Sequence, residues 1–318
     1  MTQYDVFNGD ADGLCALHQL RLAEPADSVL ITGVKRDIAL LKRVQVAAGD
    51  HINVLDVSLE KNHDALVAAL DAGAQVRYID HHFPGDIPVS DALQTHIDTD
   101  AETCTGLIVD GLLDGKYRAW AVTAAFGDNL QVKARAAAEP LGLDAADVDR
   151  LERLGTLLNY NGYGASVKDL HFAPDDLSLR LRPFESPFDF MQQDDAWHTL
   201  EAGYEDDIKN ARTTPIARET AGSASLMFPN AAWARRVGGV YANELAREHP
   251  ARAHALLTEA ADGSYLVSVR APLENRTGAD DLCRSFETGG GRKAAAGINR
   301  LPASDVDRFN EALQQRYG

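Results

Sequence analysis

Hydrophobic positions in the first 80 residues alternate between two patterns. Short runs rich in β-branched and aromatic residues are bounded by polar or glycine residues, which is typical of buried strands. Between these runs, apolar residues recur at helical spacing. The patterns predict strands at 4–8, 28–33, 51–57 and 74–80, and helices at 13–23, 37–49 and 61–73. This alternation is typical of a parallel α/β sheet with helices on its faces.

The remainder of the chain divides by its pattern into three parts. Residues 131–185 are predicted to be mainly helical, and 184–225 mix proline, phenylalanine and charge, with a polar helix expected over 201–214. A second α/β pattern then begins, with a helix at 235–249, strands at 253–260 and 265–271, a glycine loop and a last helix at 303–316. We therefore expect an α/β protein with an N-terminal parallel-sheet domain (1–185), a helical and polar connector (186–225) and a smaller C-terminal α/β domain (226–318).

Charge is distributed unevenly over the 318 residues, whose net charge is −17. From Leu226 onward, 12 lysine and arginine residues face 11 aspartate and glutamate residues, so that part carries +1 and the first 225 residues carry −18. So acidic a surface repels long nucleic acids, whose affinity rests on phosphate neutralisation. No apolar run of membrane-spanning length and no leader pattern is present, and the three cysteines lie far apart. These features predict a cytoplasmic protein with reduced thiols and no membrane association.

Acidic residues collect where the predicted strands end. In an open parallel sheet, the carboxyl ends of the strands meet at one edge, which is where ligands bind. Several carboxylates with an imidazole suit Mn²⁺ or Mg²⁺, although a lone Asp-x-Asp before glycine is more typical of a solvated turn. The residues alone leave a metal site and a set of solvated turns as alternatives. Those that follow the expected strands are Asp10, Asp12, Asp56, Asp80 and Asp128, with His81 and His82 next to Asp80.

Four short motifs resemble, in order, those of the DHH phosphoesterase superfamily. They are "DADG" (10–13), "LDVS" (55–58), "DHH" (80–82) and "FGDN" (126–129). "GGGRKAAAG" (289–297) resembles the glycine-rich signature of the accessory DHHA1 domain, and "LNYNGYG" (158–164) is similar to a segment of RecJ-like exonucleases. The motifs span almost the whole chain, and as an ordered set they are specific.

The resemblance implies a phosphoesterase with two Mn²⁺ ions, or Mg²⁺ in their place. Asp10 and Asp56 would hold one ion, and the second would be held by Asp12, Asp56, His81 and Asp128, with Asp56 as the bridge. Asp80 would orient the histidines, and His82 would lie against the substrate phosphate. Asn8 departs from the pattern, because relatives often have His or Asp there. Its amide oxygen or a water would then be the ligand, and the first ion would bind more weakly.

The resemblance also places a phosphate clamp in the C-terminal domain, facing the acidic metal site. Its members are Arg270, Gly290, Gly291, Arg292 and Lys293. Arg292 stands where the family usually has histidine, so phosphate binding is kept while proton transfer there is in doubt. An aromatic side chain could stack on a base, the candidates being Tyr160, Tyr163 and Phe83.

The resulting functional prediction is a Mn²⁺-dependent phosphodiesterase or exonuclease that hydrolyses short oligonucleotides or small nucleotides with a metal-activated water. One alternative is a RecJ-like exonuclease on long single-stranded DNA. Another, of a different class, is a catalytically impaired nucleotide sensor, to which the substitutions at Asn8 and Arg292 would point. A homodimer is left open.

Overall fold

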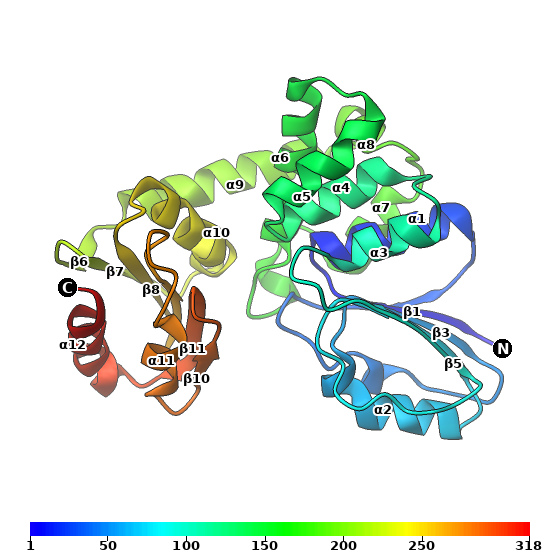
Figure 1. Ribbon diagram of the computed structural model, residues 1–318, viewed down its shortest axis with the longest axis horizontal. Helices are drawn as coiled ribbons and strands as arrows, with labels where there is room; N and C mark the ends of the chain where they lie inside the picture. Colours follow the sequence, from blue (N-terminus) through cyan, green and yellow to red (C-terminus); the bar gives the residue numbers. More distant parts are fainter. The chain divides into compact units, whose positions relative to one another are not determined.

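Two compact units make up the protein in the computed structural model, which describes residues 1–318. They are Met1–Ala202 and Gly203–Gly318, and helix α9 (Ala196–Thr213) runs across the division (Figure 1). The connector expected at 186–225 contains α8 (Pro187–Gln193), α9 and β6 (Ile216–Glu219), and β7 (Ser223–Phe228) crosses the boundary expected at 226.

A five-stranded, all-parallel sheet is the centre of the first unit, as the sequence predicted. Its strand order is β2-β1-β3-β4-β5. Helices α1 (Ala11–Ala23), α3 (Thr105–Leu112) and α4 (Arg118–Gly127) lie over one face and α2 (Leu59–Asp71) over the other (Figure 1). The strands are β1 (Gln3–Phe7), β2 (Val29–Ile31), β3 (His51–Leu55), β4 (Gln75–Asp80) and β5 (Leu93–Ile97), of which the sequence patterns missed β5.

A helical layer completes this unit and confirms the helical prediction for 131–185. Short 3₁₀ turns at Glu139–Leu141 and Val167–Asp169 separate some of its members. The helices are α3 (Thr105–Leu112), α4 (Arg118–Gly127), α5 (Gln131–Ala138), α6 (Ala145–Asn161) and α7 (Pro174–Leu181).

The two faces of the parallel sheet differ in chemistry. Val6, Val54 and Tyr78 point to the α2 side and belong to a buried apolar cluster. On the α1 side, the middle of the strands carries a polar row in register, Asp5, Asn53 and Arg77.

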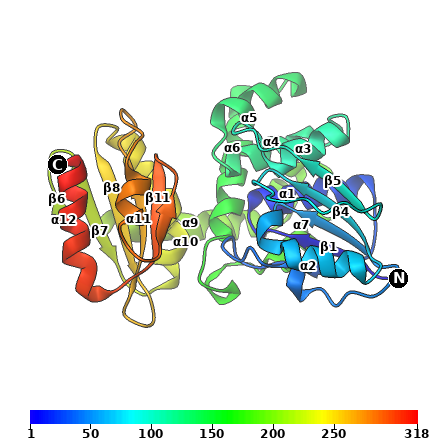
Figure 2. The same ribbon diagram turned by 60° about the horizontal axis from the view of Figure 1, so that its bottom comes forward.

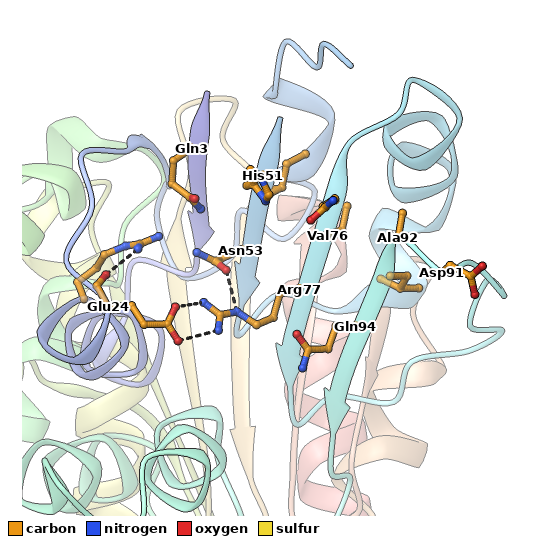
Figure 3. A pocket seen from close by; sticks show the side chains of 13 residues that line it. Gln3, Glu24, His51, Asn53, Val76, Arg77, Asp91, Ala92 and Gln94 are labelled. Carbon is orange, nitrogen blue, oxygen red and sulfur yellow. Dashed lines mark hydrogen bonds and ion pairs between the residues drawn. The ribbon is translucent and has the colours of Figure 1, made fainter. Parts of the chain in front are cut away.

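Two members of this row, Asn53 and Arg77, line an open hollow of about 420 Å³ (Figure 3). Asn53 donates to Asp5 (2.9 Å) and accepts from Arg77 (2.9 Å), and Arg77 forms a bidentate ion pair with Glu24. These polar groups form hydrogen bonds and ion pairs with one another. The polar lining of the hollow therefore has a structural role and does not by itself indicate a ligand site.

The predicted helix at 37–49 is wrong. This segment is irregular apart from one 3₁₀ turn at Leu41–Arg43, although Leu40 and Leu41 are buried against α2 as the apolar pattern required. The Asn62 side chain accepts from the Leu41 N–H (3.1 Å) and donates to the Ile38 carbonyl (2.7 Å). A side chain therefore satisfies the backbone groups that a helix would have paired internally.

A six-stranded mixed sheet forms the second unit, in the order β10-β11-β9-β8-β7-β6. Helix α10 (Ala232–Glu248) packs on one face, and α11 (Ala279–Arg284) and α12 (Val306–Tyr317) pack on the other (Figure 2). The strands not yet given are β8 (Ala253–Glu259), β9 (Tyr265–Arg270), β10 (Gly289–Gly291) and β11 (Ala295–Leu301). The expected glycine loop is thus a short edge strand that opens a hairpin.

No helix in this structure combines the length and apolar composition that crossing a membrane requires. The three cysteines, Cys15, Cys104 and Cys283, are buried and unpaired.

His18 gives the first unit an expected acid sensitivity. Burial lowers the pKa of His18 from 6.5 to about 4, and its ring packs edge-on to Trp120 and bonds the Phe184 carbonyl (2.8 Å). His18 therefore becomes protonated near pH 6.5 in the unfolded chain but only near pH 4 in the folded chain. The free energy of unfolding falls as pH drops through this window. We expect His18 to make the unfolding free energy about 2 kcal/mol lower at pH 5 than at pH 7.

Urea unfolding of wild type and His18→Gln at both pH values measures this, because glutamine can donate to Phe184 without titrating. An equal drop in both proteins would show that His18 is not its source.

Candidate metal centre

Three acids of the candidate site follow adjacent strands at one edge of the parallel sheet. Asp10 comes three residues after β1, Asp56 directly follows β3, and Asp80 is the last residue of β4. The strand order 2-1-3-4-5 places the topological switch point between β1 and β3, where open α/β sheets bind ligands. Asp128 corrects the sequence prediction, because it caps the C-terminus of helix α4 and follows no strand.

The loop from β1 to α1 fixes the first two acids in different directions. Asp10 is the N-cap of α1, and its Oδ1 accepts from the backbone N–H groups of Asp12 (3.0 Å) and Gly13 (3.1 Å). Glycine is needed at 13 because a Cβ would lie 2.2 Å from the Asn8 carbonyl oxygen. Asp12 lies in the first turn of the helix and is fully buried.

Helix α3 holds Asp12 from the other side. The N–H groups of Thr105 and Gly106, in its first turn, donate to Asp12 Oδ2 (2.8 Å) and Oδ1 (2.7 Å). A helix N-terminus favours the charged form of a carboxylate. Burial, followed by the nearby Asp128 charge, outweighs this and raises the pKa of Asp12.

Asp56 lies among the other carboxylates in a strained backbone conformation. Its φ of 56° is in the left-handed region, which aspartate adopts more readily than most residues, and its N–H donates to the Ile79 carbonyl (3.1 Å). Burial, and then the negative charges of Asp10 and Asp12, raise the pKa of Asp56 well above its ordinary value. Without a cation, the site disfavours ionisation of this side chain.

His81 presents one ring nitrogen to the acids. Its Nδ1 lies 3.1 Å from the Thr103 carbonyl, which can only accept, so Nδ1 is the donor and the ring turns Nε2 toward the acids. His81 Nε2 is 3.5 Å from Asp56 Oδ1, 3.5 Å from Asp128 Oδ2 and 4.0 Å from Asp12 Oδ2. An imidazole oriented by a backbone carbonyl at one nitrogen, with carboxylates around the other, is a typical metal-ligand arrangement.

His82 is oriented differently from its neighbour. Its Nδ1 lies 2.7 Å from Asp80 Oδ1, which also accepts from the His81 N–H (2.9 Å). Burial would lower the pKa of His82, but the hydrogen bond and charge of Asp80 outweigh it and raise the pKa. The His82 side chain is 41% exposed, so its other nitrogen is free to meet a ligand.

Lys35, which follows β2, belongs to the cluster although the sequence analysis missed it. Its ammonium contacts Asp10 Oδ2, and it lies 2.9 Å from Asn159 Oδ1 and 3.6 Å from Asp128 Oδ1. Burial acts against the Asp10 charge, but the ammonium of Lys35 prevails and the pKa of Asp10 is lowered. Two signals could have found this group: a lysine at the carboxyl end of a predicted strand, and the "LNYNGYG" segment that supplies Asn159.

The donor set fits a divalent cation. Asp12, His81 and Asp128 offer ligand atoms within 4.8 Å of one another, and so do Asp56, His81 and His82. In the second group, however, His82 Nδ1 is already bonded to Asp80. Asn8 Oδ1 and Asp80 Oδ2 are buried without a hydrogen-bond partner, and such atoms call for a ligand. Asn8 donates from Nδ2 to the Lys35 carbonyl (3.2 Å), which leaves its oxygen for a cation.

The predicted residues of the phosphate clamp all lie in the second unit. Arg270 ends β9, and its Nε donates to Asn243 Oδ1 on α10 (2.6 Å). Arg292 and Lys293 are exposed in the turn between β10 and β11. A Cβ on Gly290 would meet no atom within 4 Å, whereas one on Gly291 would lie 2.5 Å from Ala296 Cα. Packing therefore requires glycine at 291 but leaves open space beside Gly290. Phosphate binding by these residues stays a prediction.

Of the aromatic candidates, Tyr160 is excluded, because it is fully buried and its hydroxyl bonds His171 Nε2 (2.8 Å). Phe83, directly after His82, is 70% exposed.

Comparison with protein-family models and with curated proteins finds no match for this sequence. Solved structures do match. RecJ of Thermus thermophilus in complex with Mn²⁺ has a TM-score of 0.65 at 18% identity, over 99% of this chain and 52% of that chain, so this chain spans about half of that RecJ. Another exonuclease RecJ bound to manganese has a TM-score of 0.63 at 17% identity, over 99% and 89%.

The pGpG-specific phosphodiesterase PggH from Vibrio cholerae has a TM-score of 0.60 at 16% identity, over 99% of this chain and 98% of that chain. At these identities the likeness establishes a shared fold.

Proposed function

We propose that this chain, which has the fold of the DHH phosphoesterases, is a Mn²⁺-dependent phosphodiesterase that releases nucleotides from short oligonucleotides or small nucleotides. The observation that carries the proposal is that His81 Nε2 is surrounded by carboxylates of three separate elements. Sequence motifs in family order and the RecJ and PggH folds support the same class.

The side chains divide the work between binding and charge stabilisation. Asp12, His81 and Asp128 would hold one divalent cation, Asp10 and Asn8 would contribute to a second, and Asp56 would serve both. Such cations lower the pKa of water enough for it to attack phosphorus at neutral pH. His82, kept cationic more readily by Asp80, would donate to a phosphate oxygen as negative charge develops on it. Arg270 and the Gly290–Lys293 turn would bind a substrate phosphate.

Two features favour short substrates. The first 225 residues carry a net charge of −18, which opposes binding of a long polyanion. Phe83 offers an exposed ring next to His82, where one base could stack. The likeness to PggH, over nearly all of both chains, agrees with a small substrate, while the likeness to RecJ keeps the long-strand exonuclease as the second candidate.

A substrate panel tests the proposal with the full chain. We expect Mn²⁺ to support hydrolysis of RNA of two to five nucleotides and of linear dinucleotides, and chelation to abolish it. The panel also includes a 3′,5′-bisphosphate nucleotide, a cyclic dinucleotide, pyrophosphate and a long single-stranded DNA. Equal or faster cleavage of the long DNA would favour the RecJ-like alternative. Nucleotide binding with no Mn²⁺-stimulated turnover on any substrate would favour the sensor.

A further inference from the structure

Lys35 places a positive charge inside the cluster that the proposed function reserves for metal ions. Its Nζ contacts Asp10 Oδ2 directly and is 3.6 Å from Asp128 Oδ1. The side chain is 25% exposed and the Asp10 carboxylate only 3% exposed, so water does little to screen this pair. Asp10 is thus occupied by a cation that belongs to the chain itself.

The protein holds this lysine in place from three sides. Its backbone N–H donates to the Gly162 carbonyl (2.8 Å), and its carbonyl accepts from Asn8 Nδ2 (3.2 Å). Asn159 Oδ1 accepts from the ammonium (2.9 Å), and the ring centroid of Tyr163 lies 5.6 Å away. Residues from the β1–α1 loop, α6 and the segment after it therefore fix the position of Lys35. A solvated surface lysine has no such set of contacts.

Asp12 provides the contrast within the same cluster. Its oxygens accept from two neutral backbone N–H groups at the start of α3, and a carboxylate oxygen can accept further ligands without losing these bonds. No lysine or arginine side chain has to leave Asp12 when an ion arrives. At Asp10, an ammonium and a divalent cation would compete for Oδ2 and repel each other at short range.

We propose that Lys35 is a built-in competitor for the metal at Asp10, so that the ion on the Asp10 side binds more weakly than the ion on the Asp12–His81–Asp128 side. The inference rests on the proposed metal centre. In the metal-free protein the ammonium neutralises Asp10 and keeps the crowded acids together. When an ion binds at Asp10, the ammonium turns away from that carboxylate while its backbone stays anchored.

Mn²⁺ titration of the metal-free, full-length protein, followed by the electron paramagnetic resonance signal of free Mn²⁺, tests this. Wild type is expected to show two unequal dissociation constants. In Lys35→Met the weaker constant should tighten by about tenfold or more, the scale on which groups next to a metal ligand act, and the tighter one should keep its value. Lys35→Arg keeps the charge and should resemble wild type, and Lys42→Met, at an exposed lysine, should change nothing.

Thermal unfolding supplies a second readout. Without metal, Lys35→Met should unfold at a lower temperature than wild type, because Asp10 loses its counter-charge, and saturating Mn²⁺ should remove the deficit. If this variant does not fold without metal, Lys35→Gln, which can donate to Asp10 without charge, takes its place and should shift the weaker constant in the same direction.

The possible outcomes distinguish a failure of the proposed metal centre from a failure of the competitor role of Lys35. A wild-type protein that binds no Mn²⁺ would overturn the metal centre, and this inference with it. Two bound ions with an unchanged or weakened second constant in Lys35→Met would overturn only the competitor role. The same would follow if Lys35→Arg behaved like Lys35→Met.

Discussion

Replacing Asp56 with asparagine is expected to abolish Mn²⁺-dependent hydrolysis while making the metal-free protein more stable. Metal-centred charge stabilisation supplies several kcal/mol to such reactions, so we expect the rate to fall by about a thousandfold or more. Stability should rise because the site raises the pKa of Asp56 through burial and the charges of Asp10 and Asp12. Asparagine removes one of several crowded negative charges without changing the shape of the side chain.

The sign of the pH effect follows from the same shift. A carboxyl whose folded-state pKa is raised destabilises the protein above its ordinary pKa, so in metal-free wild type Asp56 contributes a gain in stability as pH falls from its raised pKa toward the ordinary value of aspartate. Asp56→Asn should lack this gain. Initial rates with Mn²⁺ and thermal midpoints in chelator at several pH values measure both effects, with exposed Asp64→Asn as the control. Activity within tenfold of wild type would rule out Asp56 as a shared ligand.

Replacing His81 with alanine is expected to weaken metal binding, whereas replacing His82 with alanine is expected to slow catalysis. His81 Nε2 faces Asp12, Asp56 and Asp128, so His81→Ala should weaken Mn²⁺ binding by more than the 10- to 100-fold that is roughly the cost of losing a supporting group. His82 Nδ1 is bonded to Asp80, so His82→Ala should bind Mn²⁺ normally but lower kcat by about 10²- to 10³-fold, the usual loss for one donor to the transition state.

Each variant is the control for the other, because both remove an imidazole from adjacent positions. Mn²⁺ dissociation constants from titration, and kcat at saturating Mn²⁺, distinguish the roles. Loss of metal in His82→Ala with its retention in His81→Ala would reverse the assignment.

The strand-end acids show how much of this site the sequence could predict. Short runs of β-branched and aromatic residues located β1, β3 and β4, and a parallel sheet brings their carboxyl ends to one edge, so Asp10, Asp56 and Asp80 follow from local pattern and sheet geometry. Asp128 was expected there for the wrong reason. It reaches the site from the end of α4, a helix that the sheet argument does not place.

Other features depended on contacts between distant residues. The 37–49 segment has helical spacing, yet Asn62 from α2 satisfies its backbone outside a helix. Lys35 meets Asp10 only because Asn8, Asn159 and Gly162 position it, and these come from two segments, the β1–α1 loop and the end of α6. The glycine run 289–291 has the local pattern of a turn, but pairing with β11 makes it a strand. Local pattern carries no information about such partners.

The left-handed backbone at Asp56 bears on how this residue should be mutated. Alanine disfavours a φ of 56° by about 1 kcal/mol, because its Cβ crowds the following carbonyl and no short polar side chain compensates. An alanine scan would therefore confound a conformational penalty with the loss of a ligand at the residue where the distinction matters most. Asparagine adopts this backbone conformation readily, so Asp56→Asn measures the loss of the negative charge alone. Glycine removes the backbone strain together with the whole side chain, so Asp56→Gly measures the loss of the ligand without a conformational penalty. The pair separates the chemistry of Asp56 from its geometry.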